Sequence, residues 1–81
     1  MEPIRQVEKF FEIFEHIQRI VDSPIEWSTK YDLVFSEAVS ESIKETGIRI
    51  DWSDPDMDYE DDVRAYFGAL EEKANELKHL L

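Results

Sequence analysis

Apolar residues recur every three or four positions in three stretches of the chain, with polar residues between them. This spacing puts the apolar side chains on one face of a helix, so it predicts three amphipathic helices. We expect them over residues 3–21, from residue 28 or 29 to about 46, and from residue 58 or 59 to about 80. Together they predict an all-α fold, a small three-helix bundle forming a single acidic domain over residues 1–81.

Residues that start and stop helices stand at the ends of these stretches. Pro24 disfavours the helical conformation in the residue before it and so ends the first helix. Ser28 is the expected N-cap of the second helix, and Gly47 suits a left-handed C-cap after it. Asp58, with Asp61 three residues on, suits the N-cap of the third helix, where acidic residues also favour the helix dipole.

The segment between the second and third helices alternates apolar and polar residues, as a short strand does. No second segment has a pattern that could pair with it. We therefore expect residues 48–52 to be an extended connector laid across the bundle, with Ile48, Ile50 and Trp52 pointing inward.

The charge of the chain is strongly negative: 20 Asp and Glu against 9 Lys and Arg give a net charge of −11 over 81 residues. This excludes a nucleic-acid binder of the ordinary basic kind and indicates a cationic partner, a metal or a role in solubility. The absence of cysteine excludes disulfides and thiolate zinc sites. No apolar run approaches the length that spans a membrane, so we expect a soluble intracellular protein.

The acidic residues are densest between positions 51 and 62, which hold seven carboxylates and no Lys or Arg. These are Asp51, Asp54, Asp56, Asp58, Glu60, Asp61 and Asp62. Asp54, Asp56 and Asp58 match the first ligands of a calcium-binding loop, but Tyr59 and Ala65 stand where that loop needs Gly and Glu. We therefore predict no dedicated metal site and no cofactor. Weak binding of Ca²⁺ or Mg²⁺ by the clustered carboxylates is kept as an alternative function.

Residues with catalytic chemistry are few and scattered. His16 and His79 belong to no metal-ligand spacing, and the two glycines, Gly47 and Gly68, form no phosphate-binding loop. Carboxylates become catalytic acids only in a pocket that shifts their pKa, and a bundle of this size has little room for one. We therefore expect that the protein is not an enzyme.

Glutamates also form rows at helical spacing. Glu37, Glu41 and Glu45 line up along the second helix, and a second row holds Glu8, Glu12 and Glu15. Each four-residue step rises about 6 Å, whereas one DNA strand carries a charge about every 3.4 Å. Such rows could imitate a polyphosphate surface, although the usual interpretation of a charge row is a solvated outer face. Arg19 and Lys44 neutralise the rows in part.

Three aromatic residues lie outside the helical stripes or at their edge: Trp27, Trp52 and Tyr59. Each tryptophan can cap an open end of the core. Alternatively, Trp52 and Tyr59 can anchor a partner, since aromatic residues dominate interface hot spots and attract arginine through cation–π contact.

Residues 45–54, Glu-Thr-Gly-Ile-Arg-Ile-Asp-Trp-Ser-Asp, are followed by Asp-Asp-Val-Arg at 61–64. This connector with its downstream acidic helix start resembles phage-encoded DNA-mimic antirestriction proteins of the Ocr type. The resemblance covers residues 45–64, and the first helix does not match. It implies a small acidic helical inhibitor that occupies the DNA site of a host nuclease complex. Asp51, Asp54, Asp61 and Asp62 would then imitate phosphates.

These patterns predict a non-catalytic inhibitor in the cytoplasm of a bacterial host. It would bind a basic nucleic-acid-binding protein, such as a restriction or CRISPR-type defence nuclease, with no direct contact to nucleic acid or membrane. The predicted partner-binding residues are the seven carboxylates of 51–62, Trp52, Tyr59, Glu37, Glu41 and Glu45. The alternative is a protein–protein interaction module or homodimer that uses the apolar stripe of the third helix, its acidity serving solubility.

Overall fold

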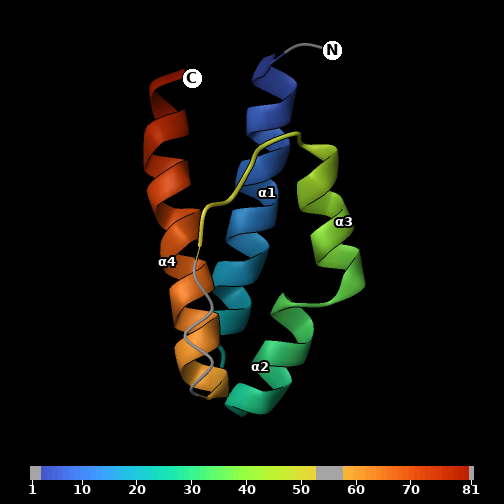
Figure 1. Ribbon diagram of the computed structural model, residues 1–81, viewed down its shortest axis with the longest axis vertical. Coiled ribbons are helices and arrows are strands. Elements are labelled where there is room, and N and C mark those ends of the chain that lie inside the picture. Colours follow the sequence, from blue (N-terminus) through green and yellow to red (C-terminus); the bar gives the residue numbers. More distant parts are fainter. Residues whose placement is uncertain (1–2, 53–57, 81) are drawn as a thin grey trace.

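The computed structural model describes residues 3–52 and 58–80, which fold into four α-helices and a terminal 3₁₀ turn (Figure 1). The helices are α1 (Pro3–Asp22), α2 (Trp27–Val34), α3 (Glu37–Glu45) and α4 (Tyr59–Leu77), and η1 (Lys78–Leu80) follows α4 directly. No strand occurs within the described ranges. The all-α prediction is thus confirmed, but the count of three helices is wrong.

The difference lies in the second predicted helix, which is broken into α2 and α3. Phe35 leaves the helical region with φ −98° and ψ 19°, and Ser36 is extended at φ −64° and ψ 154°. The Ser36 hydroxyl then accepts a hydrogen bond from the Val39 N–H at 3.3 Å, so Ser36 is the N-cap of α3. The predicted cap at Ser28 is also wrong, because α2 begins at Trp27 and its N-cap is Glu26.

The other helix ends follow the predicted local chemistry. Gly47 has a φ of +71°, the left-handed conformation expected after the second helix. Asp58 is extended, and its carboxylate accepts a hydrogen bond from the Asp61 N–H at 2.8 Å, which confirms it as the N-cap of α4.

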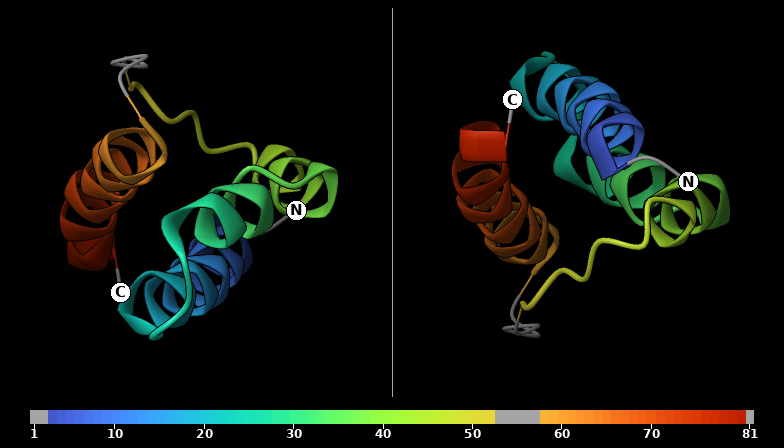
Figure 2. Two further views of the ribbon diagram at one scale, coloured as in Figure 1. Left: turned by 90° about the horizontal axis from the view of Figure 1, so that it is seen from below. Right: turned by 90° about the horizontal axis from the view of Figure 1, so that it is seen from above.

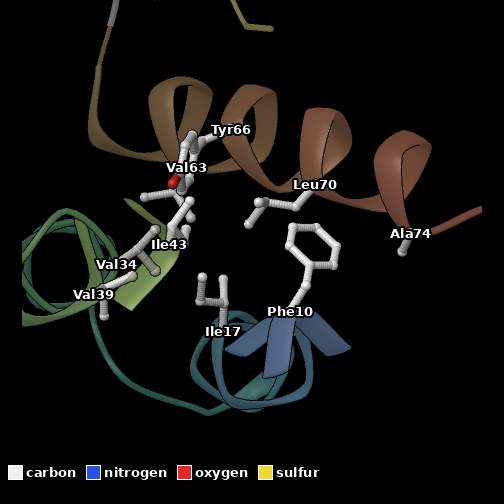
Figure 3. Close-up of a cluster of buried hydrophobic side chains, with 9 residues drawn as sticks. All are labelled: Phe10, Ile17, Val34, Val39, Ile43, Val63, Tyr66, Leu70 and Ala74. Carbon is white, nitrogen blue, oxygen red and sulfur yellow. The ribbon is translucent and has the colours of Figure 1, made fainter. Parts of the chain in front are cut away.

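Helices α1, α2–α3 and α4 surround one apolar core from three sides (Figures 1 and 2). Figure 3 shows its nine buried side chains, with Phe10 of α1 pointing toward Leu70 of α4. They are Phe10, Ile17, Val34, Val39, Ile43, Val63, Tyr66, Leu70 and Ala74. At the edge of this core the ring of Phe14 stacks on that of Phe67, 5.3 Å between centroids. The apolar side chains of α4 therefore pack into this core.

The connector after α3 crosses the side of the bundle between α3 and α4 (Figures 1 and 2). Ile48, Ile50 and Trp52 are half-buried and pack against the core, as predicted. The Trp52 ring lies 5.4 Å from that of Phe35 and 5.1 Å from that of Tyr66. The connector thus covers the side of the core that lies between α3 and α4.

Candidate partner-binding surface

The acidic segment predicted as the centre of the site lies partly outside the described residues, which omit Asp54 and Asp56. Asp51 is exposed at the end of the connector, and Asp58 is exposed at the start of α4. In Figure 1 the start of α4 lies at the same end of the bundle as α2.

The carboxylates at the start of α4 take part in the fold itself. Asp58 caps the helix, as described above. Glu60 accepts a charge-assisted hydrogen bond from Arg64 at 2.7 Å, one helical turn further on. Asp62 is buried, with 8% of its surface exposed. Acids in a first helical turn also favour the dipole, so part of this cluster is explained by the formation of α4.

Two rows of glutamates lie on the surface of the bundle. The α3 row (Glu37, Glu41 and Glu45) and the α1 row (Glu8, Glu12 and Glu15) are exposed at every position. Among the described residues, Glu45 alone of these six forms an ion pair, with the ammonium of Lys9 on α1 at 2.9 Å. Because both partners are exposed, this pair neutralises charge more than it stabilises the fold.

The structure divides the predicted residues into two groups. Helices α3 and α4 lie on either side of α1, so the α3 row is apart from the acidic start of α4 (Figures 1 and 2). The α1 row and the α3 row, in contrast, belong to helices that touch, and the Lys9–Glu45 pair joins them. The carboxylates therefore form two separate acidic surfaces.

A shallow groove of about 340 Å³ runs between α1 and α3. We name it the α1–α3 groove, and its lining residues are Lys9, Glu12, Ile13, His16, Ala38, Val39 and Ser42. Sequence reasoning missed it. The sequence indicates it only through Ala38 and Ser42, which are small and four residues apart. They therefore lie on the same side of α3 and leave space between that side and α1.

The aromatic candidates divide between the core and the surface. Trp52 is half-buried in the ring cluster, consistent with a core-capping role. Tyr59 is 53% exposed, although its ring packs edge-on against Tyr31 at 5.2 Å. Tyr59 is thus the more accessible of the two predicted anchors.

Trp27 is the first residue of α2, rather than a loop residue, and it faces two cations. The ammonium of Lys30 lies 4.0 Å from the centre of its ring, and the guanidinium of Arg64 lies 5.0 Å away. Lys30 is buried and donates a hydrogen bond to the Val21 carbonyl in the last turn of α1 at 2.6 Å. This corner therefore ties α1, α2 and α4 together.

The remaining titratable groups of interest are Tyr66 and the two histidines. Burial raises the pKa of the Tyr66 hydroxyl, because the ionised form loses its hydration. His16 and His79 are both exposed, on different helical elements. Within residues 3–52 and 58–80 no group of three His, Asp or Glu side chains is placed to hold a metal ion.

In the part of the chain that the structure describes, no helix has both the length and the apolarity needed to cross a bilayer.

Comparison with known proteins finds no family model, no curated protein and no solved structure that matches the chain.

Proposed function

We propose that the protein is a non-catalytic inhibitor that binds a basic nucleic-acid-binding protein, such as a restriction or CRISPR-type defence nuclease of a bacterial host. Its carboxylates would form ion pairs with the Lys and Arg side chains of the partner that otherwise bind phosphates. The observation that carries this proposal is the pair of exposed glutamate rows on the touching helices α1 and α3. The resemblance of residues 45–64 to DNA-mimic antirestriction proteins supports it.

The rows suit this role because they resemble two lines of phosphates in spacing. Neighbouring members of one row are about 4.5–6 Å apart along the helix axis, within about a factor of two of the charge spacing along a DNA strand. The axes of packed helices lie about 8–10 Å apart, so the two rows run within reach of a single basic surface. Five of the six glutamates form no ion pair with another described residue, which leaves them to meet an external cation.

The alternative interaction module lacks a comparable observation. In the apolar stripe of α4, Val63, Tyr66, Leu70 and Ala74 are buried in the core of the monomer, and Phe67 and Leu77 are half-buried against it. Leu81, the last member of the predicted stripe, lies outside the described residues. Among the described residues, the large apolar side chains with marked exposure are Ile25, Leu33 and Tyr59, none of which belongs to that buried stripe.

The proposal is tested by capture from host lysate with the tagged protein at about 50 mM and about 500 mM salt, since screening weakens exposed charge pairs. We expect a DNA- or RNA-binding protein to be recovered at low salt and lost at high salt. Recovery of a partner with no nucleic-acid role, equally at both salts, would refute charge mimicry.

A matched pair of variants locates the binding charges. The double variant Glu37→Gln/Glu41→Gln removes two carboxylates from the α3 row, and Glu71→Gln/Glu72→Gln removes two exposed carboxylates from α4. Both lower the net negative charge equally. We expect only the first to reduce capture, because the second leaves both rows intact. Equal losses would show that overall charge, rather than the rows, determines binding.

A further inference from the structure

We infer that a groove between α3 and the connector binds a short acidic segment of a partner protein, in which carboxylates flank an apolar side chain. This inference goes beyond the proposed function and concerns a different surface. The groove has a volume of about 290 Å³, and we name it the connector groove. Its apolar lining residues are Ile43, Ile48, Ile50, Trp52 and Tyr66.

The charged side chains that line the connector groove are both basic. They are Lys44 in the last turn of α3 and Arg49 in the connector, and no described carboxylate lines the groove. This local sign is the reverse of that of the chain, which has 20 Asp and Glu against 9 Lys and Arg. The α1–α3 groove, in contrast, is lined by both Lys9 and Glu12. An occupant with negative charge therefore complements the connector groove.

The two cations are available to an external partner. Both side chains are exposed, and neither forms an ion pair with another described residue. The helix dipole favours a cation at Lys44, but Arg49 lies beyond the end of α3 and has no such role. Exposed ion pairs contribute little affinity by themselves, so the apolar lining has to supply part of it. The occupant therefore needs an apolar side chain as well as carboxylates.

The connector favours an occupant in an extended conformation. Residues 48–52 form neither helix nor strand and run along the side of the bundle (Figure 1). The backbone N–H groups of residues 49–52 donate no hydrogen bond to another described residue, so an extended segment can pair with them. Successive side chains of such a segment point in opposite directions. Carboxylates two residues before and after an apolar residue therefore face the groove together with it.

A short protein segment fits this place better than a nucleic acid does. Glu41, Glu45 and Asp51 are exposed on the same two elements, although none of them lines the groove. A run of phosphates that continued past the groove would meet these carboxylates and the net charge of −11. A short acidic segment ends before it reaches them.

The test measures binding of the labelled peptide Glu-Ser-Ile-Ser-Glu to the intact protein. One analogue has Gln in place of each Glu, and a second has Ser in place of Ile. We expect both analogues to bind more weakly, because the first lacks the ion pairs and the second lacks the apolar contact. Equal binding of the three peptides would overturn the inference.

A charge variant tests the role of the two cations. Lys44→Gln/Arg49→Gln should weaken peptide binding about fivefold, as for two exposed ion pairs. Arg19→Gln/Lys78→Gln is its control, since it removes the same charge at exposed positions outside the groove. The control should weaken binding less, because it changes only the long-range repulsion.

A second variant fills the groove without changing charge. Ser40 also lines the groove, and we expect Ser40→Trp to lose roughly tenfold in peptide affinity. Ala38→Trp is its control, since Ala38 is exposed on α3 but lines the α1–α3 groove instead. The charge variant alters exposed side chains alone, so it keeps the test decisive if Ser40→Trp fails to fold.

Backbone amide shifts locate the contact and separate the possible occupants. Shifts centred on Ile43, Ile48 and Ile50 on addition of the peptide support the inference. Shifts centred elsewhere, or equal effects of each variant and its control, overturn it. It is also overturned if short single-stranded DNA shifts these residues and binds more tightly than the peptide. Dimerisation that shifts them without peptide would instead assign the groove to a second copy of the chain, against the inference.

Discussion

At the scale of single residues, Lys30 is the clearest case of a charge used for the fold. Its side chain is 5% exposed, and its ammonium donates to the Val21 carbonyl beside the Trp27 ring. We expect Lys30→Met to lower the free energy of unfolding by about 1–3 kcal/mol, because the part-buried Val21 carbonyl loses its donor. Urea denaturation measures this change. Lys44→Met, at an exposed position, should shift stability by less than about 0.5 kcal/mol, and equal effects would contradict the assigned role.

The two glycines provide a second residue-scale prediction, with opposite signs. Gly47 has a φ of +71°, and a Cβ there would meet only Gln6 at 3.5 Å, so the strain of Gly47→Ala comes from the backbone. We expect a loss of about 1 kcal/mol. Gly68 lies within α4 with open space around it, so Gly68→Ala should stabilise by about 0.5–1 kcal/mol. Thermal melts of both variants would show whether the signs differ as expected.

At the scale of elements, the break between α2 and α3 can be tested by one substitution. Ser36→Ala removes the hydroxyl that accepts from the Val39 N–H, and we expect a loss of about 1 kcal/mol in unfolding free energy. In a continuous helix the same change would be stabilising, because alanine is the better helix former. Ser40→Ala, inside α3, should show that stabilising sign and serves as the control.

The same break shows what sequence patterns can and cannot predict. Helix ends at Asp58 and Gly47 were predictable because capping depends on neighbouring residues alone. Apolar spacing runs unbroken from α2 into α3, so periodicity does not reveal that Phe35 and Ser36 leave the helix. The rows of glutamates could be predicted for the same local reason. The α1–α3 groove could not, because it depends on how two helices far apart in sequence pack.

At the scale of the whole molecule, the net charge of −11 acts on folding and on binding with opposite signs. Like charges repel within the compact state, so added salt should raise the free energy of unfolding, whereas salt should weaken the pairing of the rows with a basic partner. We expect stability in urea melts to rise between about 20 mM and about 200 mM NaCl while partner affinity falls over the same range. The combined variant Glu37→Gln/Glu41→Gln/Glu71→Gln/Glu72→Gln carries four fewer negative charges, so its stability should depend less on salt. If the stability of both the wild type and the combined variant were independent of salt, self-repulsion would be negligible. The acidity would then carry no cost in stability for a function to offset.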